Sequence, residues 1–373
     1  HAVRFAYLNT AAAMLARDEM DDSDLPRLVQ LWQHMVNRRM SVSGGIGSLP
    51  LTEGFGRDYE LDPELVYNET CAALACMLWN HEMALLTGAP EYDDLFEWQL
   101  YNAAAVGIGV DGCSFFYNNP LTSNRGFKRE AWYDIPCCPS NLSRVWESLA
   151  DQAVSSEGNT IFIHQFLGGE FELEVDRQIR LVMTTGLPAE GWVKAKLEMD
   201  APQRMMISFR KPAWADSYSF TINGEPITPE HVISTDGGVS AVGLNFDASA
   251  WVYLERVFQP GDEIAFSLGM PVRLFQQDKR IAKCGGQVAV SRGPLLYCSE
   301  GIDNPEWETS RSINSSSLVV EENNCMFDGI PTILAHSPSG QPVRLIPYYQ
   351  WGNRGETTMS VFPMCEDCHK EYT

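Results

Sequence analysis

The sequence lacks a long apolar run, and it is poor in positive charge for its length. No stretch approaches the roughly 20 apolar residues that a membrane-spanning helix needs. The 27 Lys and Arg residues are outnumbered by 49 Asp and Glu, which gives a formal net charge of −22. This balance argues against a nucleic-acid partner and against an anionic membrane surface. We therefore expect no nucleic acid and no membrane span, and a ligand that is neutral or cationic.

The sequence also lacks the cysteine density of a small disulfide-stapled protein, since its ten cysteines are spread over 373 residues. In so long a chain they predict buried free thiols for the most part. The run Cys365-x-x-Cys368-His369 imitates a haem-attachment motif, but its place in a short charged tail indicates a chance match. No signal peptide is recognised, and the chain begins with His1 instead of Met. Localisation is left open between cytoplasm and periplasm.

What is present is the composition of a globular protein of two or three domains. Apolar residues make up 45% and aromatic residues 11% of the chain. The ten Trp and thirteen Tyr residues suit a carbohydrate-binding surface, because sugar C–H faces stack on aromatic rings. Most buried aromatic residues are simply core, however. A homodimer is as compatible with this composition as a monomer.

Hydrophobic periodicity divides the chain near residue 157. Before it, apolar spacing near 3.6 predicts a helix over 2–16, and Asp24-Leu25-Pro26 opens a second helix with Leu28, Leu31, Trp32 and Met35 on one face. Further helices are expected from after Asp62 to about Leu86, from 92 to about 106, and from 139 to about 153. Residues 41–62 are expected to form a glycine-rich loop, and 113–117 a short strand. Paired helices with long loops favour a bundle or an α/α barrel. Because a closed toroid of six hairpins needs about twice this number of helices, we expect the helical part to be incomplete on its N-terminal side.

Short alternating segments after residue 158 predict an all-β region. The clearest segments are 160–166, 170–175, 178–184, 194–199 and 204–209, and Asn223-Gly224 is a hairpin signal. We divide the chain into a helical domain at 1–157, a β-sandwich at 158–275, and a second β-sandwich with a C-terminal tail at 276–373.

Adjacent cysteines at 137 and 138 are the first candidate for chemistry. Pro139 suits the first position of a helix, which would put Cys138 at the cap and Cys137 just outside it. The positive end of the helix dipole lowers a thiol pKa there, and a thiolate can bind zinc or attack carbon. Two buried thiols at a helix start are the plainer interpretation, unless further ligands converge on them.

Glu69 and Cys71 are candidate partners for that pair. Two residues apart, they would lie on nearly opposite faces of a regular helix. They can share one metal only if the helix begins here, with Asn68 as its cap. Three sulfurs and one carboxylate form a ligand set that zinc accepts. A first-turn carboxylate and a core cysteine are the alternative.

Two further residues could serve a polar substrate. Glu53 lies in the glycine-rich loop, where a carboxylate could act as a general acid/base over a cleft; a solvated loop glutamate is the alternative. Tyr117 could offer its hydroxyl to a ligand, or it could be a core aromatic residue.

These segments resemble glycoside hydrolase family 127, the β-L-arabinofuranosidases. The resemblance is carried by the glycine-rich loop with Glu53, by Tyr67-Asn68-Glu69-Thr70-Cys71, by Phe115-Phe116-Tyr117-x-Asn119-Pro120 and by Cys137-Cys138-Pro139-x-Asn141. It implies part of an (α/α)6 barrel followed by jelly-roll-like β-sandwich domains, in a family whose members extend much further on the N-terminal side.

Residue by residue, the resemblance implies that four side chains bind Zn²⁺ and that one of them is also the nucleophile. The implied zinc ligands are Glu69, Cys71, Cys137 and Cys138, with Cys137 as the nucleophile. Glu53 is implied as the acid/base, and His1 and Tyr117 as sugar-contacting residues. The expected activity is retaining hydrolysis that releases L-arabinofuranose or a similar sugar from plant glycans.

Two other functions are compatible with the same residues. Related members suggest an aceric-acid-type residue of pectin as an alternative sugar. A non-enzymatic protein would use the zinc site structurally and bind glycans through its sandwiches.

Overall fold

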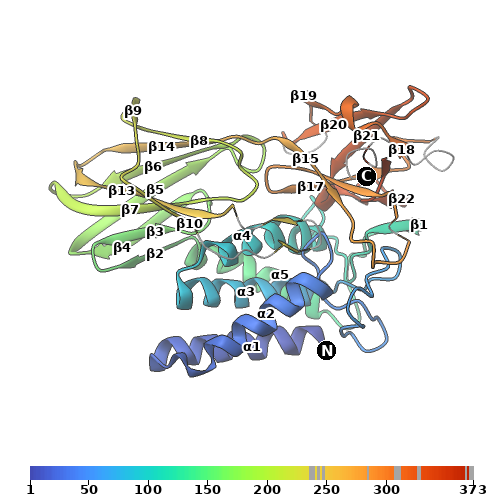
Figure 1. Ribbon diagram of the computed structural model, residues 1–373, viewed down its shortest axis with the longest axis horizontal. Coiled ribbons are helices and arrows are strands. Elements are labelled where there is room, and N and C mark those ends of the chain that lie inside the picture. The colour runs from blue at the N-terminus through green and yellow to red at the C-terminus, as the bar shows by residue number, and fades with distance from the viewer. Residues whose placement is uncertain are drawn as a thin grey trace.

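The computed structural model describes residues 1–234, 240–241, 244–245, 248–283, 285–305, 312–325, 329–365 and 368. Helices form one layer, and two separate β regions cover it (Figure 1). The first β region, drawn in green and yellow, and the second, drawn in orange and red, lie side by side on the helical layer. The chain therefore combines helical and β domains, as the sequence predicts.

Five α-helices make up the helical layer within the described residues: α1 (Ala2–Glu19), α2 (Leu25–Arg39), α3 (Thr70–Thr87), α4 (Pro90–Gln99) and α5 (Cys137–Glu147). Helix α3 is buried on nearly all sides, because it is apolar around its whole circumference. It packs against α1, α4 and α5. A π-helical turn (Leu100–Ala104) and two short 3-10 turns (Ala105–Gly107 and Leu149–Gln152) extend α4 and α5. None of the described helices is long and apolar enough for a bilayer crossing.

The predicted strand at 113–117 is wrong. Phe115 makes only isolated bridges, to Ile108 and to Glu130, and no continuous ladder forms. Phe115 and Phe116 are buried in the helical layer, so tertiary packing and not strand pairing explains this apolar run.

The first β region is a sandwich of two sheets. One sheet has the order β10-β13-β7-β3-β2 and the other β4-β5-β6-β14-β8-β9. Their inward side chains form one continuous core. The bounds are β2 Val154–Glu157, β3 Thr160–Ile163, β4 Gly169–Val175, β5 Arg177–Thr185, β6 Trp192–Glu198, β7 Gln203–Lys211, β8 Tyr218–Ile222, β9 Glu225–Ile227, β10 His231–Ser234, β13 Ala250–Phe258 and β14 Glu263–Leu268, with a small ribbon of β11 Ser240–Ala241 and β12 Leu244–Asn245.

The hairpin predicted at Asn223-Gly224 is confirmed. Both residues have positive φ angles, 53° and 85°, and they connect β8 to β9. The five β segments predicted between residues 160 and 209 also appear as strands.

The second β region is built on one antiparallel sheet of eight strands, with the order β1-β22-β17-β21-β20-β19 and a branch at β17 to β16 and β15. The bounds are β1 Thr122–Phe127, β15 Val272–Gln276, β16 Val288–Arg292, β17 Leu295–Glu300, β19 Val319–Cys325, β20 Pro331–His336, β21 Pro342–Pro347 and β22 Thr357–Ser360, beside a parallel pair of β18 Ser312–Ile313 and β23 Met364–Cys365. Strand β1 comes from the helical part of the sequence and pairs with β22 (Figure 1).

A buried ionic group joins α4 to the first sandwich. Arg210 of β7 is fully buried and pairs with Asp94 and, at 2.8 Å from Nη2 to Oε1, with Glu97. His164 Nδ1 lies 2.9 Å from Asp93 Oδ2. These five residues, Asp93, Asp94, Glu97, His164 and Arg210, are called the interface group below. The acidic residues belong to α4, whereas His164 and Arg210 belong to the first β region.

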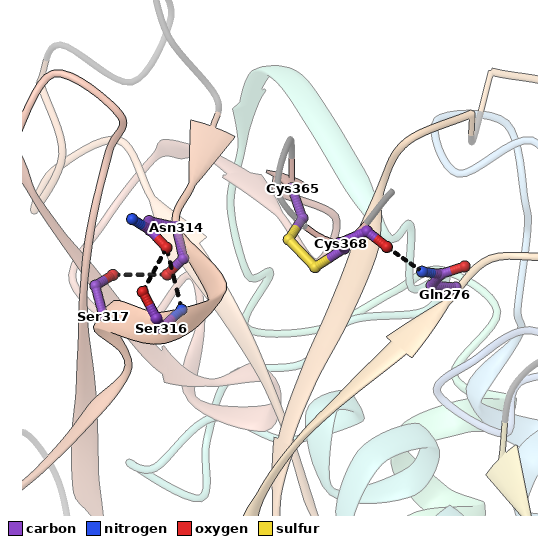
Figure 2. The surroundings of a disulfide bond; sticks show 6 residues. All are labelled: Gln276, Asn314, Ser316, Ser317, Cys365 and Cys368. Atoms are coloured by element: carbon purple, nitrogen blue, oxygen red, sulfur yellow. Dashed lines mark hydrogen bonds between the residues drawn. A yellow bond between two sulfur atoms is a disulfide. The ribbon is translucent and has the colours of Figure 1, made fainter. Parts of the chain in front are cut away.

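Two of the tail cysteines form a disulfide. Figure 2 shows the Cys365–Cys368 bond, with the Cys368 carbonyl accepting a hydrogen bond of 3.1 Å from Gln276 Nε2. The haem-attachment match is therefore a coincidence of spacing in this structure, because both sulfurs are bonded to each other. His369 lies outside the described residues. Of the other described cysteines, Cys71, Cys76, Cys138 and Cys298 are buried free thiols, as the sequence predicts.

Candidate active site and metal centre

The N-termini of α3 and α5 place four potential metal ligands together. Glu69 is the N-cap residue of α3 and Cys71 lies in its first turn, while Cys137 and Cys138 begin α5. One ligand atom from each residue lies within 4.8 Å of each of the others. This set is called the Glu/Cys cluster below. Residues 66 positions apart in sequence thus meet at two helix starts, where the dipoles favour anions.

The structure corrects the predicted helix boundaries by one or two residues. Glu69, and not Asn68, is the cap of α3, because Asn68 adopts a left-handed conformation with φ 43°. Helix α5 begins at Cys137, so Pro139 is its third residue and Cys138 its second. Proline is tolerated there because the first-turn N–H groups have no intrahelical acceptor. The two thiols still lie at the positive end of the helix.

Asn68 is held by polar contacts on both sides. Its Nδ2 donates to the Asn119 carbonyl at 3.3 Å, and Asn119 Nδ2 donates to the Asn68 carbonyl at 2.9 Å. A Cβ on Gly45 would lie 2.7 Å from the Asn68 side chain, so only glycine fits at that position. These contacts fix the turn that presents Glu69 to the sulfurs.

Distances within the Glu/Cys cluster are short enough for one ion to contact all four groups. Glu69 Oε1 lies 3.8 Å from Cys137 Sγ and 3.7 Å from Cys138 Sγ, and the two sulfurs are 3.9 Å apart. Cys71 and Cys138 are buried, whereas Cys137 is half-buried and is the most accessible of the three cysteines. Glu69 Oε2 is buried and has no hydrogen-bond partner among the described residues.

The pKa values of the Glu/Cys cluster indicate whether its members are protonated when no cation is bound. Burial, and then the charge of Glu53, raise the pKa of Glu69 to about 7. Burial raises the pKa of the Cys137 thiol, and the hydrogen bond with Cys71 together with burial raises that of Cys138. The thiol of Cys71 has a lowered pKa, chiefly because Cys138 donates to it. Without a cation the cluster keeps protons; a bound cation would replace them.

The donor set fits zinc. Thiolate sulfur with one carboxylate oxygen is a soft-to-borderline ligand set, and four protein ligands match zinc's preferred coordination number. The unpartnered Glu69 Oε2 adds a buried polar atom for which an ion supplies a partner.

Glu53 lies in the predicted loop and is presented by strained backbone. Its φ angle is 47°, a backbone conformation that residues other than glycine rarely adopt. The Ala2 backbone N–H donates to the Glu53 carbonyl at 2.8 Å. The carboxylate is 37% exposed, and each of its oxygens has one partner: His1 Nε2 lies 3.1 Å from Oε2, and the Tyr67 hydroxyl donates to Oε1 at 3.2 Å.

Tyr117 contacts Cys137, the candidate nucleophile. Its hydroxyl lies 2.9 Å from Cys137 Sγ, and its backbone carbonyl accepts from Thr70 N at 3.0 Å. Burial, then this contact with Cys137, hold the pKa of Tyr117 well above its ordinary range. The phenol therefore keeps its proton and can donate to the sulfur.

Sequence reasoning assigned no role to Tyr67 or Asn141, although both belong to the quoted motifs. Tyr67 contacts Glu53, and burial followed by the charges of Glu69 and Glu53 raises its pKa well above the ordinary range. Asn141, one helical turn after Cys137, interacts with Cys71 and accepts from Tyr7 at 3.2 Å and Arg144 at 2.6 Å. The i, i+4 spacing from Cys137 was the available signal for Asn141. Tyr67 had none, because its partner lies in a separate loop.

Comparison with known proteins identifies the domains. The sequence model of the β-L-arabinofuranosidase GH127 catalytic domain matches residues 1–151, that of the GH127 middle domain matches 160–270, and that of the glycoside hydrolase family 127 C-terminal domain matches 272–363. The Glu/Cys cluster and Glu53 thus lie within the match to the catalytic domain.

Relatives agree with these matches. The non-reducing end β-L-arabinofuranosidase of Bifidobacterium longum subsp. longum is 31% identical over 407 aligned positions, which cover 97% of this chain and 59% of that protein. A solved GH127 β-arabinofuranosidase superposes with a TM-score of 0.85 at 28% identity, covering 99% of this chain and 60% of that one. A GH127 β-L-arabinofuranosidase from Geobacillus stearothermophilus T6 gives the same score and identity, covering 98% and 60%.

The chain therefore spans about three fifths of the length of these relatives. Family models for three consecutive domains match, in order, nearly all of its sequence, and two solved members share its fold. The chain belongs to glycoside hydrolase family 127.

Proposed function

We propose that this chain carries the nucleophile, the acid/base and the zinc ligands of a retaining glycosidase that releases L-arabinofuranose or a similar sugar from plant glycans. The observation that supports it most is the Glu/Cys cluster, in which three sulfurs and one carboxylate converge and Cys137 is the one residue that is not fully buried. The sugar is taken from what the B. longum relative acts on.

Cys137 would be the nucleophile. Its sulfur attacks the anomeric carbon, a C–S bond forms, and the bond from that carbon to the leaving oxygen breaks. The Tyr117 hydroxyl lies 2.9 Å from the same sulfur and would keep it oriented. Glu69, Cys71, Cys137 and Cys138 would hold the zinc ion, which when bound keeps the sulfurs deprotonated at neutral pH.

Glu53 would be the acid/base. It gives its proton to the leaving oxygen in the first step and takes a proton from water in the second. That water attacks the anomeric carbon, the C–S bond breaks and the thiolate of Cys137 is restored. Two displacements at the same carbon give net retention. His1, which lies beside Glu53 Oε2, would contact the sugar.

We also propose that the helical layer is part of an (α/α)6 barrel. Helices α1 and α3 pack closely along each other, and α3 packs on α4, as successive hairpins of such a barrel do. The five described helices are fewer than a closed barrel of six hairpins needs.

The product configuration tests the mechanism. We expect proton NMR of the first-formed sugar, released from an aryl β-L-arabinofuranoside by the full natural protein, to show retained configuration. Inversion would overturn the two-step scheme. Activity only on an aceric-acid-type glycoside would keep the mechanism and change the sugar.

A substitution separates an enzyme from a glycan-binding module. Glu53→Gln is expected to lower turnover by about 10²–10⁴-fold with folding and zinc content unchanged. The matched control is Glu64→Gln, just after the same loop, whose carboxylate lies 3.4 Å from Lys283 at the surface. A binding module without catalysis predicts no turnover for the natural protein and unchanged glycan affinity for both variants.

A further inference from the structure

Tyr67 connects the two halves of the site and has no role in the scheme so far. Its backbone is fixed on both sides, since its N–H donates to the Ser48 carbonyl at 3.3 Å and its carbonyl accepts from Asn119 N at 3.0 Å. Its hydroxyl donates to Glu53 Oε1 at 3.2 Å. Two residues further along the chain, Glu69 enters the Glu/Cys cluster.

The Glu53 side chain is less constrained by its own backbone than a residue in a helix or strand, so contacts with other residues must fix its orientation. Its side chain is over one third exposed and extends from a loop with a left-handed φ angle. A carboxylate in that setting has several rotamers of similar energy. Apart from His1, which lies on Oε2, Tyr67 is the protein group that reaches its carboxylate among the described contacts.

The two tyrosines of the site form a matched pair. The rings of Tyr67 and Tyr117 have centroids 6.2 Å apart. One hydroxyl reaches Glu53 and the other reaches Cys137. Each of the two candidate reacting groups thus contacts one phenol, and the two rings contact each other, so a chain of side-chain contacts connects Glu53 to Cys137.

We infer that Tyr67 is a positioning residue that fixes the Glu53 carboxyl group and determines which of its oxygens transfers the proton. The inference rests on the proposed function. Because Oε1 accepts from the phenol, the transferable proton resides on Oε2, the oxygen beside His1. When that proton passes to the leaving oxygen, the electron pair of the broken C–O bond stays on the leaving group. The carboxylate that remains keeps its hydrogen bond from Tyr67.

The decisive variant is Tyr67→Phe, made in the full natural protein and loaded with zinc. Its substrates differ only in the leaving group: one releases an alcohol or sugar that needs protonation, and the other releases p-nitrophenolate, which does not. We expect kcat/KM to fall about 10–100-fold for the first, because a charge-assisted hydrogen bond is lost. For the second we expect a change within about threefold.

Tyr297→Phe is the matched control, since its buried hydroxyl donates to the Pro331 carbonyl at 2.9 Å in the second β region. It should lose stability without any dependence on leaving group. Equal losses for both substrates, or loss of zinc from Tyr67→Phe, would make Tyr67 a structural residue and overturn the inference. So would unchanged kinetics.

A crystal structure of Tyr67→Phe gives a readout that does not depend on turnover. We expect the Glu53 side chain to leave His1 or to occupy several rotamers, with the Glu/Cys cluster unmoved. A Glu53 carboxylate that stays in place would overturn the inference. Absence of turnover in the natural protein, with Glu53 displaced in the variant, would instead count against the proposed function alone.

Discussion

Two buried groups of acidic side chains lie in the helical layer, and they differ in what balances their charge. In the interface group, Asp94 and Glu97 pair with the fully buried Arg210, and Asp93 contacts His164. In the Glu/Cys cluster, the groups that act most on Glu69 are Glu53 and three thiols. Among the described residues, no cationic side chain pairs with Glu69.

The difference separates a structural role from a binding role. A buried charge is costly unless a counter-charge accompanies it. The interface group carries its own cation, and the pairing joins two domains. The Glu/Cys cluster lacks one, so its charge state depends on protons or on an ion from solution. Burial alone would not distinguish the two groups; the origin of the counter-charge does.

Removing the internal cation should have the largest effect on stability. Arg210→Met leaves buried carboxylates without a counter-charge, and we expect it to lower the free energy of unfolding by about 3–5 kcal/mol. Urea denaturation followed by circular dichroism measures this. Arg204→Met, which breaks the exposed pair with Glu255, is the control and should change stability by less than about 1 kcal/mol. A loss below about 1 kcal/mol for Arg210→Met would show that the interface group is not a coupled unit.

Removing one ligand from the Glu/Cys cluster should act on metal content more than on folding. We expect Cys138→Ser to weaken zinc binding by at least about a hundredfold, because a fully buried thiolate is replaced by a hydroxyl. Elemental mass spectrometry of the purified protein measures zinc per chain. Cys298→Ser, which alters a buried thiol in the second β region, should leave zinc content unchanged. Equal zinc in both variants would exclude this cluster as the metal site.

Acidification should expose a smaller effect at His81 of α3, whose ring centroid lies 6.1 Å from that of His164 in the interface group. Burial lowers the pKa of His81 to about 4, while the charge of Asp93 opposes that shift. The unfolded chain therefore binds a proton between about pH 6.5 and pH 4 that the folded chain does not. This contribution to stability is present above pH 6.5 and is lost as pH falls toward 4.

For His81 the loss should be about 2 kcal/mol, less than the full shift implies because the ring is partly exposed. Stability measured against pH for the natural protein and for His81→Gln tests this, and the variant should show a shallower decline. Parallel curves would assign the acid sensitivity to other groups.

Sequence patterns predicted local structure well, and the motifs grouped four side chains that the structure brings together, whereas long-range pairing was predicted poorly. The helix around Trp32 follows from 3.6-residue spacing, and the β8–β9 turn follows from Asn-Gly. Glu69, Cys71, Cys137 and Cys138 were grouped because zinc accepts those ligand types, and the structure brings them together. Their roles remain proposals.

What could not be predicted depends on residues distant in sequence. Arg210 and Asp94 are 116 positions apart, so neither sequence neighbourhood indicates the pair. The run at 113–117 has strand-like composition, but buried aromatic contacts such as Phe116 with Trp351 decide its conformation. The predicted start of α5 lies two residues after the observed start at Cys137. The prediction assumed that Pro139 is the first helical residue, but proline is also compatible with the third position.

Strand β1 lies between Tyr117 and Cys137 in sequence, yet it pairs with β22. Thr122 contacts Ser360 through their hydroxyl groups across 238 positions. On the ribosome, at roughly 5–20 residues per second, the partner strand emerges about 10–50 s after β1. The segment between Tyr117 and Cys137 therefore reaches this pairing only after the 238 residues that separate Thr122 from Ser360 have been added to the chain. The timing of translation, and not only the stability of the fold, thus sets when the segment that leads into α5 can adopt its final conformation.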